Sequence, residues 1–364
     1  MIILLKLKHF FDLNKNRLFD IFFNRTPLPP SIAIELNYEC PSRCRTCKLW
    51  TEEFKKARIG TKVKLTVEQW KGIIGNISKI GIKNVLLGGG EPFAYPGILE
   101  VIDFCNKNNI SINTFTNGIL INDNVAKKIV LSSLNSIWFS LDGPTSDTHD
   151  YIRNVKGSFE KIYNAITLIN KYKTEFKKVK PHIYINTTIT SANIYNIFDM
   201  PKLAISMGAE ILHFQLYSVV NEELAEKTNK ILSEKAITYH SFSNLPKDLQ
   251  LSKDQIGFLL QKIPQILRIN NDKLKCTVDP MLLTTPPNIL SKGIFNIKHC
   301  NYFWNFSAIS PFGDVFPCPM LPEYFLGNVL NESFKKIWNN KKYISLRKKL
   351  RKGLFPICYN CCIR

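Results

Sequence analysis

The sequence predicts an α/β fold built around a parallel sheet, and three observations carry this prediction. Apolar, strand-like segments alternate with amphipathic helical segments through the first 217 residues. This alternation implies right-handed crossovers between parallel strands. Glycines or polar residues follow several of the strands, and three closely spaced cysteines follow the first. We therefore expect the chemistry at the carboxyl ends of the strands.

The first two strands carry the most informative segments. Ser31–Asn37 alternates as a strand and runs into the cysteines. A helix from Thr66, its N-cap, to Ile80 leads to a buried strand at Asn84–Leu87. The Gly-Gly-Gly-Glu-Pro that follows lets a polar ligand approach bare backbone groups, although an ordinary tight turn is the alternative.

Four more strands and two long helices continue the pattern. The expected strands are 110–115, 135–141, 182–189 and 210–217, and the expected helices are 158–173 and 197–207. After residue 217 the alternation is lost, with helical pieces at 222–233 and 251–267. No internal repeat is present.

Composition excludes several classes of protein. The chain has 364 residues, 45% of them hydrophobic and 21% charged, which is typical of a folded globular protein. No apolar run approaches the ~20 residues that a membrane span needs, and the opening MIILLKLKHFF lacks the features of a secretory signal. We therefore expect a cytoplasmic chain, whose ten cysteines are more often metal ligands than disulfides.

Cys40, Cys44 and Cys47 form a C-x3-C-x2-C segment. Three thiolates on one short loop can hold three irons of a cubane cluster and leave the fourth iron without a local protein ligand. Zinc is the alternative, but a structural zinc site takes four protein ligands. The spacing therefore favours an iron–sulfur cluster.

This cysteine segment after the first strand, with Gly-Gly-Glu-Pro after the second, resembles the radical S-adenosylmethionine (SAM) enzymes. The resemblance implies a partial (β/α)6 TIM-like barrel whose open iron chelates the amino and carboxylate groups of SAM. It also implies that the backbone of Gly89, Gly90 and Glu91 receives the amino group. In that family a reduced 4Fe-4S cluster cleaves SAM to methionine and a 5′-deoxyadenosyl radical, which abstracts hydrogen from substrate. An external electron donor of the flavodoxin or ferredoxin type reduces the cluster.

Further SAM contacts follow from the same resemblance, at the strand ends. The residues that match family positions are Asn117, Ser140, Asp142, Arg153 and Asn186, with Thr188 beside the last of these.

Each of these contacts has a structural alternative. Asp-Gly is a strong turn former, so Ser140 and Asp142 also fit a turn, and Arg153 also fits a structural ion pair. His149 is expected at the surface or as a cap rather than as a catalyst. No catalytic acid or base is assigned.

A second set of cysteines lies in the last 65 residues: Cys300, Cys318, Cys358 and Cys361. The first two of these cysteines are isolated in the sequence and the last two form a C-x2-C pair. Four such cysteines can close a tetrahedral or cubane site. A hairpin is expected between residues 305 and 317, around Pro311–Asp314.

This region resembles the SPASM/twitch auxiliary domain that follows radical SAM barrels, through Gly-Asp-Val-Phe-Pro-Cys318 and Leu-Gly-Asn-Val329. The shortened twitch form, with one auxiliary 4Fe-4S cluster, fits the number of cysteines best. Cys362 is an alternative to Cys361 as a ligand, and zinc an alternative to the cluster. Cys105 is expected in the core, and Cys276 is either an inert thiol or close to substrate.

Four segments are expected on these grounds. They are an N-terminal basic amphipathic segment (1–30), the radical SAM partial barrel (31–217), a connector with substrate contacts (218–298) and the auxiliary domain (299–364).

The charge is strongly positive, with 49 Lys plus Arg against 29 Asp plus Glu and a formal net charge of +20. Residues 335–352 contain nine Lys or Arg and no acid. Because stacking aromatics and a nucleic-acid module are lacking, we expect a solvated basic face rather than nucleic-acid binding. The charge favours an acidic substrate. Residues 1–23 fit either membrane-surface contact or a helix packed on the barrel.

The expected function is therefore that of a radical SAM enzyme acting on a peptide or a small molecule, with a lipid or cell-surface precursor as a third branch. The alternative from a different class is a non-catalytic zinc protein with a basic, nucleic-acid-binding surface.

Overall fold

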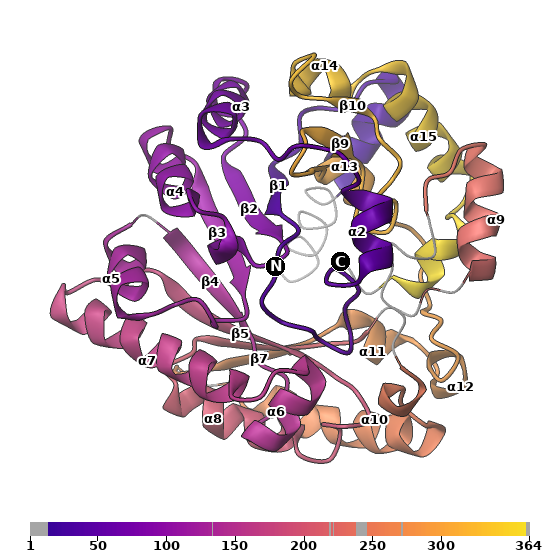
Figure 1. Cartoon of the computed structure of the whole chain (residues 1–364). Helices are drawn as coiled ribbons and strands as arrows, with labels where there is room; N and C mark the ends of the chain where they lie inside the picture. Colours follow the sequence, from indigo (N-terminus) through magenta and orange to yellow (C-terminus); the bar gives the residue numbers. More distant parts are fainter. Residues whose placement is uncertain are drawn as a thin grey trace, which may run out of the picture.

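A computed structural model describes residues 14–132, 134–217, 220, 222–237, 246–270 and 272–361. One ten-stranded sheet, in the order β10-β9-β8-β1-β2-β3-β4-β5-β6-β7, runs through the molecule, and helices cover its outer side (Figure 1). The strands from β8 through β1 to β7 are parallel, and the last two strand pairs at the β10 end are antiparallel.

The predicted partial barrel is confirmed. Its first six strands are β1 (Ser31–Asn37), β2 (Asn84–Gly89), β3 (Ser111–Thr116), β4 (Leu134–Ser140), β5 (His182–Thr188) and β6 (Ile211–Gln215). Alternate strand residues such as Ile32, Ile34 and Leu87 are fully buried in one core with apolar residues of α3 and α4. Strand follows helix in order, so the carboxyl ends of all six strands lie at one end of the sheet.

The barrel helices are α2 (Glu52–Arg58), α3 (Val67–Lys79), α4 (Ile98–Lys107), α5 (Asp123–Leu131), α6 (Ser146–Arg153), α7 (Ser158–Glu175) and α8 (Met200–Ser206), with short 3-10 turns η1 (Pro92–Ala94) and η2 (Ile197–Asp199). Thr66 caps α3 as expected and forms a capping box with Gln69. Cys105 on α4 is completely buried, which confirms its predicted place in the core.

The connector differs from the prediction because it adds a seventh parallel strand. It contains α9 (Glu222–Leu232), η4 (Lys247–Leu249), α10 (Lys253–Arg268), β7 (Lys275–Val278), α11 (Pro280–Thr284) and α12 (Pro287–Leu290). β7 pairs with β6, but four residues are too few to give a clear alternating pattern. Cys276 lies on β7, where burial raises the pKa of its thiol to about 11, as an inert thiol requires.

The C-terminal part continues the same sheet. Its elements are α13 (Tyr302–Asn305), β8 (Ala308–Ile309), β9 (Asp314–Phe316), β10 (Gly327–Asn328), α14 (Phe334–Trp338), α15 (Lys341–Lys352) and η5 (Pro356–Asn360). The expected hairpin is β8–β9, and β8 pairs in parallel with β1 through Ala33 and Ala308. The C-terminal part is therefore joined to the barrel through the sheet itself.

The basic stretch is not a uniformly solvated face, contrary to the prediction. Arg347 is completely buried, with its guanidinium over the rings of Tyr343 and Trp338. Its Nε donates to the carbonyl of Phe303 (3.1 Å). Residues such as Lys348 and Lys352 on the same helix are exposed as expected.

Residues 14–23 form a helix that precedes β1. In the part of the chain that the structure describes, no helix has both the length and the apolarity needed to cross a bilayer.

Candidate functional site

The cysteine loop begins where β1 ends, and Asn37 organises the junction. The Asn37 side chain is fully buried; its Nδ2 donates to the carbonyl of Glu91 (3.0 Å), and its Oδ1 accepts from the backbone N–H of Glu39 (2.7 Å). Asn37 thus ties the segment that leads to Cys40 to the glycine-rich end of β2. The sequence signal for this role of Asn37 is its position as a polar residue at the end of a buried strand.

The glycines at the end of β2 are required by a close backbone approach. The N–H of Gly90 donates to the carbonyl of Asn37, and that of Glu91 to the carbonyl of Glu39, both at 2.7 Å. A Cβ on Gly89 or Gly90 would lie 2.2 Å from one of these carbonyl oxygens, and Gly89 has a φ of +109°. The glycines therefore do more than form a turn, because they let β2 contact the cysteine loop directly.

Replacing Gly90 with alanine should lower the free energy of unfolding by roughly 2–4 kcal/mol, because the added Cβ forces β2 and the cysteine loop apart. Gly72 in α3 is the matched control: a Cβ added there would meet no atom within 4 Å, so Gly72→Ala should stabilise the helix by up to about 1 kcal/mol. Chemical denaturation of both variants measures this. Equal stabilities would contradict the close approach.

The Glu91 side chain is buried and points away from the loop. Its carboxylate accepts from the Thr116 hydroxyl (2.8 Å) and from the backbone N–H groups of Asn117 (2.8 Å) and Phe93 (3.1 Å). Burial raises the pKa of Glu91 to about 7, although these donors oppose the shift. The carboxylate therefore fixes the end of β3.

Asn117 is brought to the cysteine loop by this arrangement. Its side-chain amide donates to Cys40 Sγ (3.5 Å), and its Oδ1 accepts from the backbone N–H of Ile119 (2.9 Å). Asn117 thus lies against a predicted cluster ligand, which agrees with its expected place in the site.

Arg153 and Asp142 form a buried ion pair beside the same loop. Arg153 Nε lies 2.8 Å from Asp142 Oδ2, and both side chains are largely shielded from solvent. Arg153 Nη1 also donates to Cys44 Sγ (3.8 Å), and Asp142 Oδ1 accepts from the backbone N–H of Thr188 (2.9 Å). The negative charges of Asp142 and the cysteines raise the pKa of Arg153 against the opposing effect of burial. Arg153 therefore bridges the end of β4 and the cysteine loop.

Replacing Arg153 with methionine should lower the free energy of unfolding by about 3–5 kcal/mol, because the Asp142 carboxylate would be left buried without its cation. The double variant Asp142→Asn/Arg153→Met should recover part of this loss, since the asparagine side chain is neutral. Denaturation curves of the two variants measure the difference. A loss below about 1 kcal/mol in the single variant would mean that the pair behaves as an exposed one.

His149 is buried, so the expected surface position is wrong; it does not cap α6 either, because Thr145 does so. Its Nδ1 accepts from the backbone N–H of Asp142 (3.1 Å). Burial lowers the pKa of His149 to about 3, so the ring is neutral near pH 7 and can act as this acceptor. The apolar side of α6, on which His149 lies, explains why it faces inward.

Polar side chains also lie at the carboxyl ends of the neighbouring strands β4, β5 and β6. Ser140 at the end of β4 pairs in register with Asn186 on β5, and the Asn186 amide donates to Gln215 Oε1 on β6 (3.1 Å). Asn193, which is fully buried, donates to the carbonyls of Asp142 and Thr188. Gln215 and Asn193 were not predicted as site residues, because single amides outside a motif carry no signal in one sequence.

The thiols of the cysteine loop are partly or fully shielded from solvent. Burial raises the pKa of Cys47 to about 12 and also raises that of Cys40. Thiolates form at such positions when metal cations compensate their charge. Three sulfurs with nearby donors from Asn117 and Arg153 fit a cubane cluster with one open iron.

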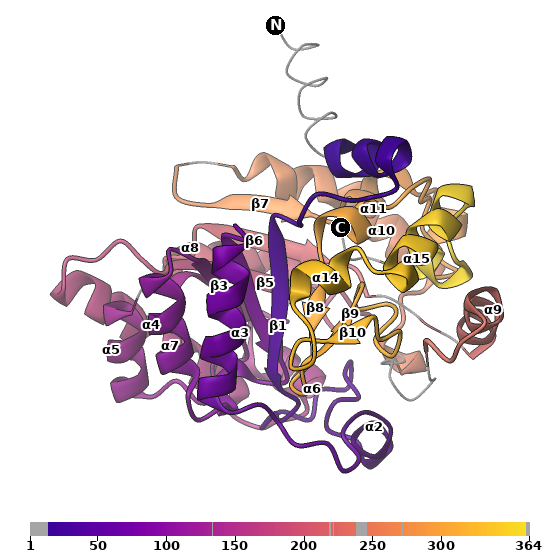
Figure 2. The same ribbon diagram turned by 90° about the horizontal axis from the view of Figure 1, so that it is seen from above.

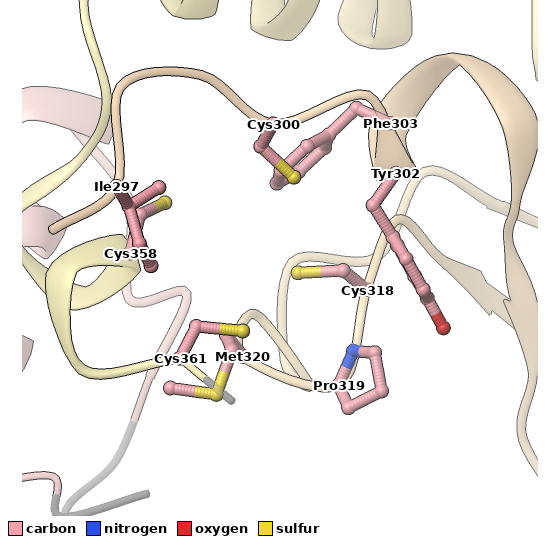
Figure 3. Close-up of a pocket in the computed structure, with 9 residues that line it drawn as sticks. All are labelled: Ile297, Cys300, Tyr302, Phe303, Cys318, Pro319, Met320, Cys358 and Cys361. Atoms are coloured by element: carbon pink, nitrogen blue, oxygen red, sulfur yellow. The ribbon is translucent and has the colours of Figure 1, made fainter. Parts of the chain in front are cut away.

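Four cysteines of the C-terminal part surround a hollow. Figure 3 shows the sulfur atoms of Cys300, Cys318, Cys358 and Cys361 directed toward a common space, with Tyr302 and Phe303 beside it. The hollow contains about 380 Å³ of empty space, including its open part. Burial, together with the neighbouring cysteines, raises the pKa of Cys318 well above its usual value.

This donor set fits an iron–sulfur cluster. In the described part of the chain, no three His, Cys, Asp or Glu side chains are placed as the ligands of a single metal ion; the four sulfurs stand around a space instead. Cys362, the alternative ligand to Cys361, lies outside the described residues.

A cavity lies at the carboxyl ends of β5 and β6. It contains about 640 Å³ of empty space, counted to its open mouth, and its lining is Ile189, Leu216, Tyr217, Gln250, Leu251, Leu290, Ser291, Lys292, Gly293 and Phe295. Among the lining residues that the structure describes, Lys292 is the only charged one.

Hydrogen bonds tie the wall of this cavity to both cysteine sites. The Tyr217 hydroxyl donates to the carbonyl of Thr46 in the first cysteine loop (3.0 Å). The N–H of Phe295 donates to the carbonyl of Tyr359 (2.7 Å), and Asn360 Nδ2 donates to the carbonyl of Gly293 (2.6 Å). A molecule in this cavity would thus contact a wall that is hydrogen-bonded to both sites.

Comparison with known proteins agrees with this geometry. Residues 34–192 match the model of the radical SAM superfamily, and residues 300–362 match that of the SPASM iron–sulfur cluster-binding domain. The AdoMet-dependent heme synthase of Methanosarcina barkeri is 27% identical over 92% of this chain and 89% of its own length. The mycofactocin maturase MftC of Mycobacterium tuberculosis is 25% identical over 95% of this chain and 80% of its own length.

Solved structures show the same fold. SuiB of Streptococcus suis, bound to its precursor peptide SuiA, superposes with a TM-score of 0.66 at 17% identity, over 92% of this chain and 70% of SuiB.

The chemistry supplied by these domains is that of a SAM-binding 4Fe-4S cluster, SAM itself and an auxiliary iron–sulfur cluster. The cysteine loop and the glycine-rich strand end lie within the first matched range, and the four-cysteine hollow lies within the second. The chain belongs to the radical SAM superfamily and is a radical SAM enzyme with a C-terminal SPASM/twitch-type auxiliary iron–sulfur domain.

Proposed function

We propose that Cys40, Cys44 and Cys47 hold the SAM cluster, and that Cys300, Cys318, Cys358 and Cys361 hold one auxiliary 4Fe-4S cluster. The converging sulfurs of the C-terminal four, and the burial of Cys44, Cys318 and Cys358, support this assignment. The bound groups supply an electron to SAM and so a 5′-deoxyadenosyl radical; the protein orients the reactants and keeps water away.

Within the same proposal, the SAM contacts divide into direct and indirect ones. Gly89, Gly90 and Glu91 offer backbone groups, and Asn117, Ser140 and Asn186 offer polar side chains at the strand ends. Arg153 reaches the cysteine loop directly. Asp142 is fully buried, so it acts by holding Arg153 and Thr188.

The substrate occupies the cavity at the carboxyl ends of β5 and β6, and the bonds from its wall to both cysteine sites are the observation that carries this proposal. A substrate C–H bond gives its hydrogen atom to the 5′-deoxyadenosyl radical. The four C-terminal cysteines would hold a one-electron acceptor for the resulting substrate radical, which would release one proton as it is oxidised. The apolar lining and the single Lys292 favour a substrate with an apolar body and a carboxylate.

Peptide maturation is the first candidate reaction. MftC is named as a maturase, and SuiB carries a precursor peptide in its structure. A peptide side chain beside a C-terminal or acidic carboxylate would fit the cavity.

Small-molecule oxidation of a heme precursor is the second candidate. Its specific support is the heme synthase relative, which this chain matches over 89% of that protein's length. A carboxylate-bearing precursor would also meet Lys292.

The enzyme takes its electron from an external donor of the flavodoxin or ferredoxin type, and it makes peripheral contact with a membrane. The basic charge of the chain and the exposed apolar residues of the N-terminal helix support these two parts of the proposal.

The deciding experiment is an anaerobic assay with reductant, SAM and substrates deuterated at the candidate C–H positions. Deuterium in 5′-deoxyadenosine identifies the substrate that is attacked, whether peptide or heme precursor. Formation of 5′-deoxyadenosine without deuterium from either would reject both candidates. Stoichiometric zinc without iron, and no 5′-deoxyadenosine at all, would reject the assigned cluster sites.

A further inference from the structure

The helix at residues 14–23 is packed with its polar face inward and its apolar face outward. Asn16 and Asp20, four residues apart and thus on one face, are 9% and 0% exposed. Phe22 and Phe23 are 76% and 64% exposed, and Phe19 is 43% exposed. A surface helix of a globular protein normally has the opposite arrangement.

The polar face is fixed by specific bonds to the auxiliary domain. The Asp20 carboxylate accepts from Trp304 Nε1 (2.9 Å) and pairs with Arg351 (2.5 Å), while its backbone carbonyl accepts from Arg351 Nη2 (2.7 Å). Asn16 Nδ2 donates to the carbonyl of Trp304 (3.0 Å). A rotation of the helix about its axis that buried the phenylalanines would break the ion pair between Asp20 and Arg351. Because a buried charge that loses its partner is costly, the apolar face stays outward.

The outward face is also basic. Lys15 lies four residues before Phe19, on the same side of the helix, and Arg25 follows it; both are exposed. Asp20 is the only acid in residues 14–30, and it is buried against Arg351. Lys348 and Lys352 are exposed on α15, the helix that carries Arg351.

Segments that lie in the interface of an anionic membrane typically combine exposed aromatic side chains with neighbouring Lys and Arg residues. We propose that the face formed by Lys15, Phe19, Phe22, Phe23 and Arg25, called here the lipid face, docks on an anionic lipid surface. This inference names the partner for the membrane contact contained in the proposed function, on which it rests.

The lipid face lies away from the chemistry. The helix stands at the opposite end of β1 from α2 and the cysteine loop (Figure 2). Docking should therefore leave the carboxyl ends of the strands accessible, and SAM cleavage should proceed at the same rate with and without vesicles.

The test is co-flotation of the reconstituted full chain with phosphatidylcholine vesicles, with and without phosphatidylglycerol. We expect binding to the anionic vesicles, weakened by salt. The variant Phe22→Ser/Phe23→Ser should bind at least about tenfold more weakly, and Lys15→Gln/Arg25→Gln should lose about tenfold and most of the salt dependence. Val63→Ser/Val179→Ser, at two positions that are 84% and 72% exposed, is the matched control and should bind as the wild type does.

Three results would overturn the proposal. The wild type could fail to bind anionic vesicles, or the phenylalanine variant could bind them equally well. Alternatively, light scattering could show a wild-type dimer that becomes monomeric in the phenylalanine variant without any vesicle binding, which would assign the face to a second copy of the chain. SAM cleavage, measured in each variant, should be unchanged; this reports proper folding and keeps a failure of docking distinct from a failure of the radical chemistry.

Discussion

Replacing Cys44 with alanine should abolish reductive cleavage of SAM. Its thiolate is one of three proposed ligands of the SAM cluster, and Arg153 donates to the same sulfur. With two local cysteines left, the cubane should not be retained, and iron should fall from about eight to about four per chain. Anaerobic reconstitution, iron analysis and the yield of 5′-deoxyadenosine measure the effect.

Cys105→Ala is the matched control for this prediction. Cys105 is a completely buried thiol on α4, distant in sequence from both cysteine sites. Its loss should reduce stability while leaving iron content and SAM cleavage near the wild-type values. If Cys44→Ala retained all its iron and its cleavage activity, the assignment of the first cluster would be wrong.

Replacing Cys318 with alanine should separate the two clusters functionally. Cys318 is one of the four cysteines around the C-terminal hollow, so the auxiliary cluster should be lost and iron should again fall to about four per chain. SAM should still be cleaved to 5′-deoxyadenosine, because the first cysteine loop is intact. Turnover of substrate to its oxidised product should stop, because the substrate radical then lacks its electron acceptor.

The comparison of these two variants is itself a check. The proposed roles of the two clusters predict that Cys318→Ala cleaves SAM but forms no oxidised product. They also predict that Cys44→Ala neither cleaves SAM nor forms product. Equal residual product in both variants would contradict these roles, since the two sites would then contribute to the same step.

The sequence was sufficient for the main architecture, because its signals there are local. Six strands carry clear alternation or apolar runs, and the cysteine loop and the glycines are adjacent to strand ends in the chain. The Thr66 cap was readable for the same reason, since its partner Gln69 is only three residues away.

What the sequence did not show depends on contacts between distant segments. β7 has four residues and becomes a strand through pairing with β6. His149 turned inward to accept from the backbone of Asp142, and Arg347 entered the core because aromatic rings and distant carbonyls receive its guanidinium. No periodicity in one chain encodes such partners, which also explains why Asn193 and Gln215 were missed.

The parallel pairing of β8 with β1 has a consequence for the evolution and engineering of this enzyme. The two metal-binding regions are parts of one hydrogen-bonded sheet, so their separation is set by strand register rather than by a flexible linker. A chimaera that exchanges the C-terminal region for that of a relative must match the β1 edge, residue by residue, or lose both the fold and the geometry between the clusters.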